Sequence, residues 1–323
     1  MIGTQTRLAG KRIWVAGHRG MVGAALSRRL RDEDCEILTT SRETVDLRDQ
    51  VATQDWVADA KPDLVFCAAA RVGGIHANNE MPADFLCDNL RIQLNVIDAS
   101  HRAGVEKLLF LGSSCIYPRL AEQPIRESAL LTGSLEPTNQ WYAVAKIAGI
   151  LQCQAYRRQH GSNFISAMPT NLYGPGDNYH PLNSHVVAAL IRKAHEAKIR
   201  GEDSMVLWGT GAPRREFLFV DDCADALIFL MKHYDGESPV NVGVGEDITI
   251  AELAQRVAQT VGFTGQFKLD RSKPDGTPRK LLDVSRLNAL GWHASTSLET
   301  GLKIAYRDFC DRIPDMAKSH GAR

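Results

Sequence analysis

Short apolar segments alternate with helical patterns through the first half of the chain, and this alternation limits the fold more than any other feature. The apolar segments predict strands at Lys11–Ala16, Glu36–Thr40, Asp63–Ala69, Lys107–Gly112 and Phe164–Met168. Helical periodicity separates them at Met21–Arg31, Val51–Ala60, Phe85–Ala103 and Trp141–His160. Strands and helices in this order build parallel βαβ units, whose buried strands are apolar on both faces. The sequence therefore predicts an α/β fold with a doubly wound parallel sheet.

The composition changes at Tyr173, where a segment rich in Gly, Pro and Asn (YGPGDNYHPLNS) predicts an ordered loop. Beyond this loop, the pattern predicts helices at His185–Lys198 and Ala224–Lys232, strands within VLWGTGAPRREFLFVDD, and a βα unit from Asn241. We expect one domain of residues 1–172 and 213–240. A smaller C-terminal α/β domain is expected from residues 173–212 and 241–323.

Charge and apolar content exclude several classes of protein. Lys plus Arg and Asp plus Glu both number 38, so no net charge attracts nucleic acid or an anionic membrane. The apolar stretches are too short to cross a bilayer, and the first ten residues contain no secretory signal. The seven cysteines form no C-x-x-C pair, which predicts no metal site and no disulfide framework. A reducing, cytoplasmic location is expected.

Three glycines lie between the first predicted strand and its helix. Gly17, Gly20 and Gly23 follow a G-x-x-G-x-x-G spacing. Glycine lets backbone approach a pyrophosphate, which then binds at the helix N-terminus. An ordinary strand–helix turn would also use glycine, but the position within an N-terminal βαβ unit favours a Rossmann-like dinucleotide site.

The end of the second predicted strand distinguishes between cofactors. NAD sites usually place Asp or Glu there to bind the ribose hydroxyls, whereas this strand ends in Thr40, Ser41 and Arg42. Arg42 can pair with a 2′-phosphate, and Arg19 can add a second cation. The sequence therefore predicts NADP. Asp46 and Leu47 are suited to contact the adenine.

A Y-x-x-x-K motif supplies the predicted reaction centre. Tyr142 and Lys146 lie on one face of a helix, where the ammonium is expected to lower the pKa of the phenol. Ser113 and Ser114 follow a predicted strand, at the sheet edge where ligands bind. Ser113 and Tyr142 can hold a carbonyl oxygen, Tyr142 can donate a proton, and Lys146 suits the nicotinamide ribose.

These motifs resemble the extended short-chain dehydrogenase/reductase family and, within it, the GDP-L-fucose synthases. The resemblance runs from about Lys11 to about Asp308 and rests on strings such as LGSSCIYP, NQWYAVAKIAG, YGPGDNYHPLNSHV and KPDGTPRK. It implies 3,5-epimerisation and NADPH-dependent 4-reduction of GDP-4-keto-6-deoxy-D-mannose. It also implies that Cys115 and His185 are the epimerisation acid/base pair, without saying which is the base. A homodimer through Phe85–Ala103 and the Tyr142 helix is implied as well.

The expected binding residues follow from these motifs and the resemblance together. For the cofactor they are Gly17, His18, Arg19, Gly20, Met21, Val22, Gly23, Arg42, Asp46, Leu47, Leu111, Gly112, Ser113, Ser114, Tyr142, Lys146, Pro169, Thr170, Asn171, Leu172 and His185. For the nucleotide sugar they are two cations suited to a diphosphate, an aromatic ring for the base or sugar, and a carboxylate that resembles a family contact: Lys193, Arg215, Trp208 and Asp275.

Two other functions are consistent with parts of this pattern. A nucleotide-sugar 4-epimerase or 4,6-dehydratase would share the glycine loop and Y-x-x-x-K. Dehydratases, however, typically carry Thr-Asp-Glu or Thr-Glu strings where this chain has Ser113-Ser114-Cys115. A non-catalytic NADP-binding module would leave the Ser, Tyr and Lys without a role. NADPH consumption only in the presence of GDP-4-keto-6-deoxymannose would distinguish an enzyme from such a module.

Overall fold

The computed structural model describes residues 5–181, 183–273 and 275–319. A six-stranded parallel sheet forms its centre, in the order β10-β5-β4-β3-β1-β2. Its strands are β1 (Arg12–Ala16), β2 (Glu36–Leu38), β3 (Leu64–Cys67), β4 (Lys107–Leu111), β5 (Phe164–Pro169) and β10 (Val240–Val242). The predicted doubly wound fold is confirmed. Residues 1–4, within the segment expected to lack a secretory signal, lie outside the described part.

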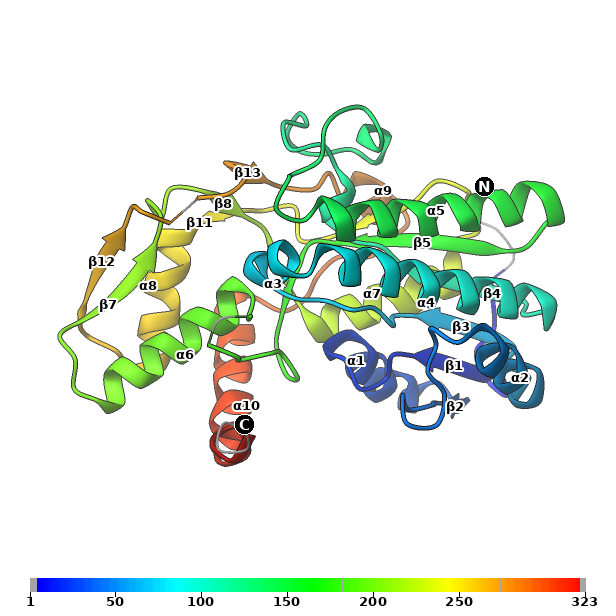
Figure 1. The fold of residues 1–323 in the computed structure, drawn as a ribbon, viewed down its shortest axis with the longest axis horizontal. Helices are drawn as coiled ribbons and strands as arrows, with labels where there is room; N and C mark the ends of the chain where they lie inside the picture. Colours follow the sequence, from blue (N-terminus) through cyan, green and yellow to red (C-terminus); the bar gives the residue numbers. More distant parts are fainter. Residues whose placement is uncertain (1–4, 182, 274, 320–323) are drawn as a thin grey trace.

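Helices cover both faces of this sheet (Figure 1). Ile13 and Val15 of β1 face α1 (Met21–Arg29), α7 (Val220–His233) and α9 (Ser285–Ala289) in one buried cluster. Trp14 and Ala16 face α2 (Gln50–Ala60), α4 (Pro82–Arg102) and α5 (Gln140–His160) in a second. Alternate residues of a strand point to opposite faces, so the continuous apolar segment buries both.

A third buried cluster lies away from the large sheet, toward one end of the molecule (Figure 1). It combines α6 (Val186–Ile199), α8 (Ile250–Val261) and α10 (Leu298–Ser319) with β7 (Ser204–Trp208). β7 pairs in parallel with β12 (Gln266–Asp270). The remaining small sheets join β6 (Asn171–Tyr173) to β9 (Phe217–Phe219), and β8 (Arg214–Arg215) to β11 (Ile248–Thr249) and β13 (Arg279–Lys280).

Helix ends follow their capping residues. The Asp49 side chain accepts a hydrogen bond from Ala52 N at 3.0 Å at the start of α2. Thr249 and Glu252 form a reciprocal capping box that starts α8. Gly161 adopts a φ of 71° where α5 ends, a left-handed conformation that glycine adopts without steric cost.

The structure differs from the expected domain boundaries. β10 begins at residue 240 and belongs to the large sheet, although residues from 241 onward were assigned to the smaller domain. Leu287 and Trp292 also pack in a cluster of the large sheet. Three α-helices that the pattern did not predict are α10, α9 and the short α3 (Ile75–Glu80). Among the described residues, no helix is both long and apolar enough to span a membrane.

Candidate active site

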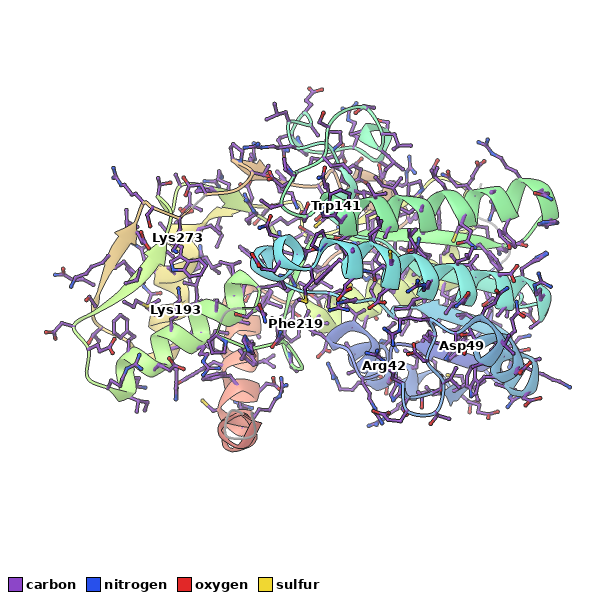
Figure 2. All side chains as sticks on the ribbon, in the orientation of Figure 1. Arg42, Asp49, Trp141, Lys193, Phe219 and Lys273 are labelled. Carbon is purple, nitrogen blue, oxygen red and sulfur yellow. The ribbon has the colours of Figure 1, made fainter. Side chains whose placement is uncertain are left out.

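One cavity of about 930 Å³ runs from the carboxyl edge of the large sheet to α6 and β7. Every residue that the sequence predicted for cofactor, catalysis or substrate lines this cavity. Figure 2 shows its two ends, with Arg42 near β2 and Lys193 on α6. The carboxyl edge of an open α/β sheet is where ligands bind, so the fold itself explains the location.

The glycine loop is fixed by close backbone packing. Gly17 has a φ of 89°, and a Cβ atom there would lie 2.7 Å from the backbone of Ala69. A Cβ atom on Gly23 would lie 2.1 Å from the carbonyl oxygen of Gly17. The first turn of α1 contains no acidic residue, and Gly20 provides no side-chain cap. The helix N-terminus therefore presents N–H groups to the cavity, as a pyrophosphate requires.

The predicted 2′-phosphate cations are both in ion pairs. Arg19 pairs with Glu43 at 2.8 Å, and Arg42 lies 3.6 Å from Asp46. Arg48, which the sequence did not single out, binds Asp46 at 2.6 Å and holds the pKa of that carboxyl at about 2. Asp46 is thus fixed by two arginines at the cavity wall. The charges of Arg42 and Arg48 offset that of Asp46, which lies in the segment after β2.

Ser113, Tyr142 and Lys146 line the cavity together, but the pKa of Tyr142 differs from the expected one. A hydrogen bond from Ser113 lowers the pKa of Tyr142, while burial, the larger effect, raises it above its ordinary value. Lys146 Nζ donates to the carbonyl oxygen of Leu111 at 2.7 Å, and burial lowers the pKa of Lys146 to about 8. The expected lowering of the Tyr142 pKa by Lys146 is therefore wrong for the protein alone. The ammonium is 5.8 Å from the centre of the phenol ring and is directed to a backbone carbonyl.

Cys115 lies beside this group, in a short 3₁₀ turn (Ser114–Ile116). Its backbone N–H donates to Ser113 Oγ at 3.3 Å, which fixes the turn. Two polar side chains reach its sulfur: Asn139 Nδ2 at 3.4 Å and Lys280 Nζ at 3.9 Å. The thiol is therefore a half-buried group among donors, and is not a structural thiol in an apolar core.

His185 immediately precedes α6 and faces the same cavity. The exposed part of the His185 side chain lines the cavity. Solvent therefore reaches the ring, although protein atoms surround it. Burial by surrounding atoms and the nearby charge of Lys280 lower the pKa of His185. The loop before it is anchored by Gly74 N, which donates to the carbonyl oxygen of Asn183 at 3.2 Å. This contact joins the RVGG segment (residues 71–74), which follows β3, to the loop that precedes His185.

At the far end of the cavity, Lys193 and Trp208 form one unit. Lys193 Nζ lies 4.6 Å from the centre of the Trp208 ring and donates to the carbonyl oxygen of Val206 at 3.5 Å. Burial lowers the pKa of Lys193. The ammonium therefore lies against the aromatic ring.

Arg215 and Asp275 lie between that end and Cys115. Arg215 Nη1 donates to the carbonyl oxygen of Arg214 at 2.8 Å, and burial lowers the pKa of Arg215. Asp275 accepts hydrogen bonds from Thr210 N at 2.7 Å and Thr210 Oγ1 at 2.8 Å, which fix its carboxylate at the cavity. Arg214, the neighbour in sequence, pairs with Asp247 at 2.7 Å and is therefore a structural residue.

Orphaned polar atoms show that the cavity fits a polar ligand. Four cavity-lining side chains have a buried atom with no hydrogen-bond partner among the described residues: His18 Nδ1, Thr40 Oγ1, Asn78 Oδ1 and Asn139 Oδ1. Buried polar atoms of this kind are usually satisfied, and a polar ligand would satisfy them. His18 and Thr40 border the glycine loop and the β2 tip, where a dinucleotide fits. Asn78, Asn139 and Lys280 are site residues that the sequence did not single out, although Asn139 and Lys280 lie in the quoted strings.

Comparison with known proteins agrees with this geometry. Residues 13–245 match the NAD dependent epimerase/dehydratase family. The chain is 58% identical to GDP-L-fucose synthase of Sinorhizobium fredii over 95% of this chain and 98% of that protein. It is 56% identical to GDP-L-fucose synthase 1 of Arabidopsis thaliana over 93% and 95% of the two chains.

A solved structure gives the same result. The fold matches a GDP-L-fucose synthetase from Naegleria fowleri bound to NADP, with a TM-score of 0.88 and 28% identity over 97% of this chain and 98% of that one. Similarity over nearly the whole length of these relatives includes both ends of the cavity. The chain belongs to the NAD dependent epimerase/dehydratase family and, within it, to the GDP-L-fucose synthases.

Proposed function

We propose that the chain converts GDP-4-keto-6-deoxy-D-mannose to GDP-L-fucose by 3,5-epimerisation followed by NADPH-dependent reduction at C4. It is then an NADP-dependent oxidoreductase with epimerase activity. One observation carries the proposal: a carbonyl-holding pair, Ser113 and Tyr142, shares a single cavity with a thiol and an imidazole. Relatives that carry the name GDP-L-fucose synthase support the identity of the substrate.

Epimerisation needs two proton-exchanging groups and one carbonyl. The ketone at C4 acidifies the hydrogens at both C3 and C5, so the same carbonyl serves both carbons. One of Cys115 and His185 removes the proton from one face of the carbon, and the other returns a proton to the opposite face. Negative charge develops on O4 in between, and Ser113 and Tyr142 stabilise it by donating hydrogen bonds.

Reduction uses the same carbonyl without release of the sugar. When bound, NADPH supplies the hydride that adds to C4. Tyr142 donates its phenolic proton to O4, which completes the alcohol. Because burial raises the pKa of Tyr142, the phenol keeps its proton until the oxygen accepts it. Lys146, held against the Leu111 carbonyl, would bind the nicotinamide ribose hydroxyls.

The residues that would hold the cofactor form one edge of the cavity. The loop from Gly17 to Gly23 would bind the pyrophosphate at the N-terminus of α1. Arg42 and Arg19 would bind the 2′-phosphate in place of Asp46 and Glu43. Leu111–Ser114 and Pro169–Leu172, which begin at the last residues of β4 and β5, would enclose the nicotinamide, and His185 would close its far side.

We also propose a two-domain arrangement and a homodimer in the cytoplasm. The large sheet with β10 and α9 would form the cofactor domain, and the third buried cluster would form the substrate domain.

On α4 and α5 several large apolar side chains are exposed: Leu94, Trp141, Val144 and Leu151. A second copy would cover this face, and light scattering should report a dimer that Val144→Glu weakens. Free thiols at all seven cysteines support a reducing compartment.

An NADPH-oxidation assay across several 4-keto-6-deoxy nucleotide sugars tests this proposal, with product stereochemistry determined by NMR. We expect rapid oxidation only with GDP-4-keto-6-deoxy-D-mannose and a product inverted at C3 and C5. A product reduced at C4 but not inverted would contradict the epimerase half. No oxidation with any of these sugars would contradict the proposal as a whole.

A further inference from the structure

Asn139 occupies the position before α5 but does not cap that helix. Asn is among the residues most favoured there, because its side-chain oxygen can accept a hydrogen bond from an N–H group of the first turn. Within residues 5–181, no such bond is formed by Asn139. Its backbone, with φ −137° and ψ 14°, lies outside the extended conformation that capping residues usually adopt. The helix that carries Tyr142 therefore starts without the stabilisation that this residue type could give.

The side chain of Asn139 is directed to the sulfur of Cys115 instead. Asn139 Nδ2 donates to Cys115 Sγ at 3.4 Å, and both residues line the cavity. The amide oxygen of Asn139 is buried and has no hydrogen-bond partner in the part of the chain that the structure describes. An amide that leaves both a helix cap and its own oxygen unsatisfied lowers stability. Such local conflicts are expected at functional positions.

The contact joins the thiol to the helix that carries the phenol. Tyr142 lies three residues after Asn139, in the first turn of α5. Burial and, as the next largest effect, charge on Cys115 raise the pKa of Tyr142, so the sulfur is near the phenol. Lys280 Nζ also reaches the sulfur, at 3.9 Å, but it comes from β13. Asn139 therefore fixes the sulfur relative to the end of α5 from which Tyr142 enters the cavity.

We infer that Asn139 is a positioning residue for epimerisation, which holds the sulfur of Cys115 beside Ser113 and Tyr142 and donates to that sulfur when it is negatively charged. The inference deepens the proposed function and rests on it. Whether Cys115 is the base or the acid, its sulfur is anionic at one stage of each inversion, either before it removes a proton or after it has given one. A hydrogen bond to a charged acceptor is stronger than one to a neutral acceptor. Hydride transfer changes nothing at sulfur, so it should not depend on Asn139.

Two substitutions test this role on the whole chain. Asn139→Ala removes the donor, and Asn139→Asp keeps the shape but brings a carboxylate that repels an anionic sulfur. With oxidised cofactor in D₂O, deuterium incorporation at C3 and C5 of the keto sugar should fall about 10- to 100-fold in Asn139→Ala, the effect of one hydrogen bond to a charged group. It should fall further in Asn139→Asp. The initial rate of NADP⁺ reduction by GDP-L-fucose, which is the reverse hydride transfer, should be unchanged in Asn139→Ala.

Asp49→Ala is the matched control for the loss of a side chain at a helix start. Asp49 does cap its helix, α2, and Figure 2 shows it well away from Trp141 in the first turn of α5. Its removal should lower Tm by about 2 °C and leave the exchange unchanged. Asn139→Ala should leave Tm nearly unchanged, because no cap is lost. Asn139→Asp, which can cap α5, should not lower Tm either.

The contrary results are distinct. Undiminished exchange in Asn139→Ala, or an equal fall in exchange and hydride transfer, would overturn the inference. Full exchange in Asn139→Asp would show that residue 139 accepts a hydrogen bond from the thiol, which also contradicts it. Failure of the proposed function is recognisable separately, because the wild type itself would then show neither exchange nor NADPH oxidation with the GDP sugar.

Discussion

The two ends of the cavity differ in whether the cations that would bind an anion are already paired with carboxylates. At the cofactor end, Arg19 and Arg42 are exposed and already face carboxylates at 2.8 and 3.6 Å. At the substrate end, burial lowers the pKa values of Lys193 and Arg215, and no carboxylate of the described residues forms an ion pair with either. Lys193 and Arg215 are half-buried, and a partly desolvated cation without a carboxylate partner is costly until an anion arrives. The substrate end should therefore contribute more binding free energy per charge. The cofactor end should mainly discriminate between NADPH and NADH.

The reaction centre lies between these ends, and its removal should leave both intact. Tyr142→Phe removes the only proton that reaches O4 in the proposed reduction. We expect kcat to fall by a factor of about 10² to 10⁴, the usual contribution of a general acid. Titration should give unchanged Kd values for NADPH and GDP. A variant with nearly full activity would show that the phenol is not the proton donor.

The substrate end can be tested by removing its half-buried guanidinium, that of Arg215. Arg215→Met should raise the Kd for GDP about 10- to 100-fold, because a charged hydrogen bond to a phosphate contributes about 1.5–3 kcal/mol. The Kd for NADPH should not change. Arg256→Met, which removes an exposed arginine on α8, is the matched control. Equal losses of GDP affinity in Arg215→Met and Arg256→Met would mean that only the net charge of the protein affects GDP binding.

The loop between the ends contains a carboxyl whose titration affects stability. Burial raises the pKa of Asp177 to about 7 from an ordinary value of 3.8. Between those values the folded state holds a proton that the unfolded state releases, so stability falls as pH rises and the full penalty applies above about pH 7. Asp177→Asn removes the penalty and keeps an acceptor for Asn178 N. Chemical unfolding should show a gain of about 1–3 kcal/mol at about pH 8 and none near pH 4. A gain that is independent of pH would contradict this.

The smallest effect is expected at the cofactor end. Arg42→Ala should weaken NADPH binding only about fivefold, since an exposed ion pair contributes about 1 kcal/mol or less. NADH binding should be unchanged, so the preference for NADPH narrows. A much larger loss would show that Arg42 is as strongly coupled to its phosphate as Arg215, and the contrast between the ends would disappear.

The cofactor end and the reaction centre differ in how well the sequence predicted their surroundings. The cofactor end is built from consecutive βαβ elements, so glycine spacing and strand tips located Gly17, Gly23 and Arg42 directly. The surroundings of Cys115 are not local: Asn139 is 24 residues away and Lys280 is 165. No periodicity links such positions. The direction of the Tyr142 pKa was missed for the same reason, because burial depends on packing that a helical i, i+4 spacing does not determine.

The central claim is that one cavity performs proton exchange and carbonyl reduction on the same sugar, and Cys115→Ser tests it most directly. In D₂O with oxidised cofactor, the wild type should incorporate deuterium at C3 and C5 of the keto sugar. The variant should keep its NADPH affinity and lose most of this exchange, by a factor of about 10² or more. Undiminished exchange in the variant would contradict the account.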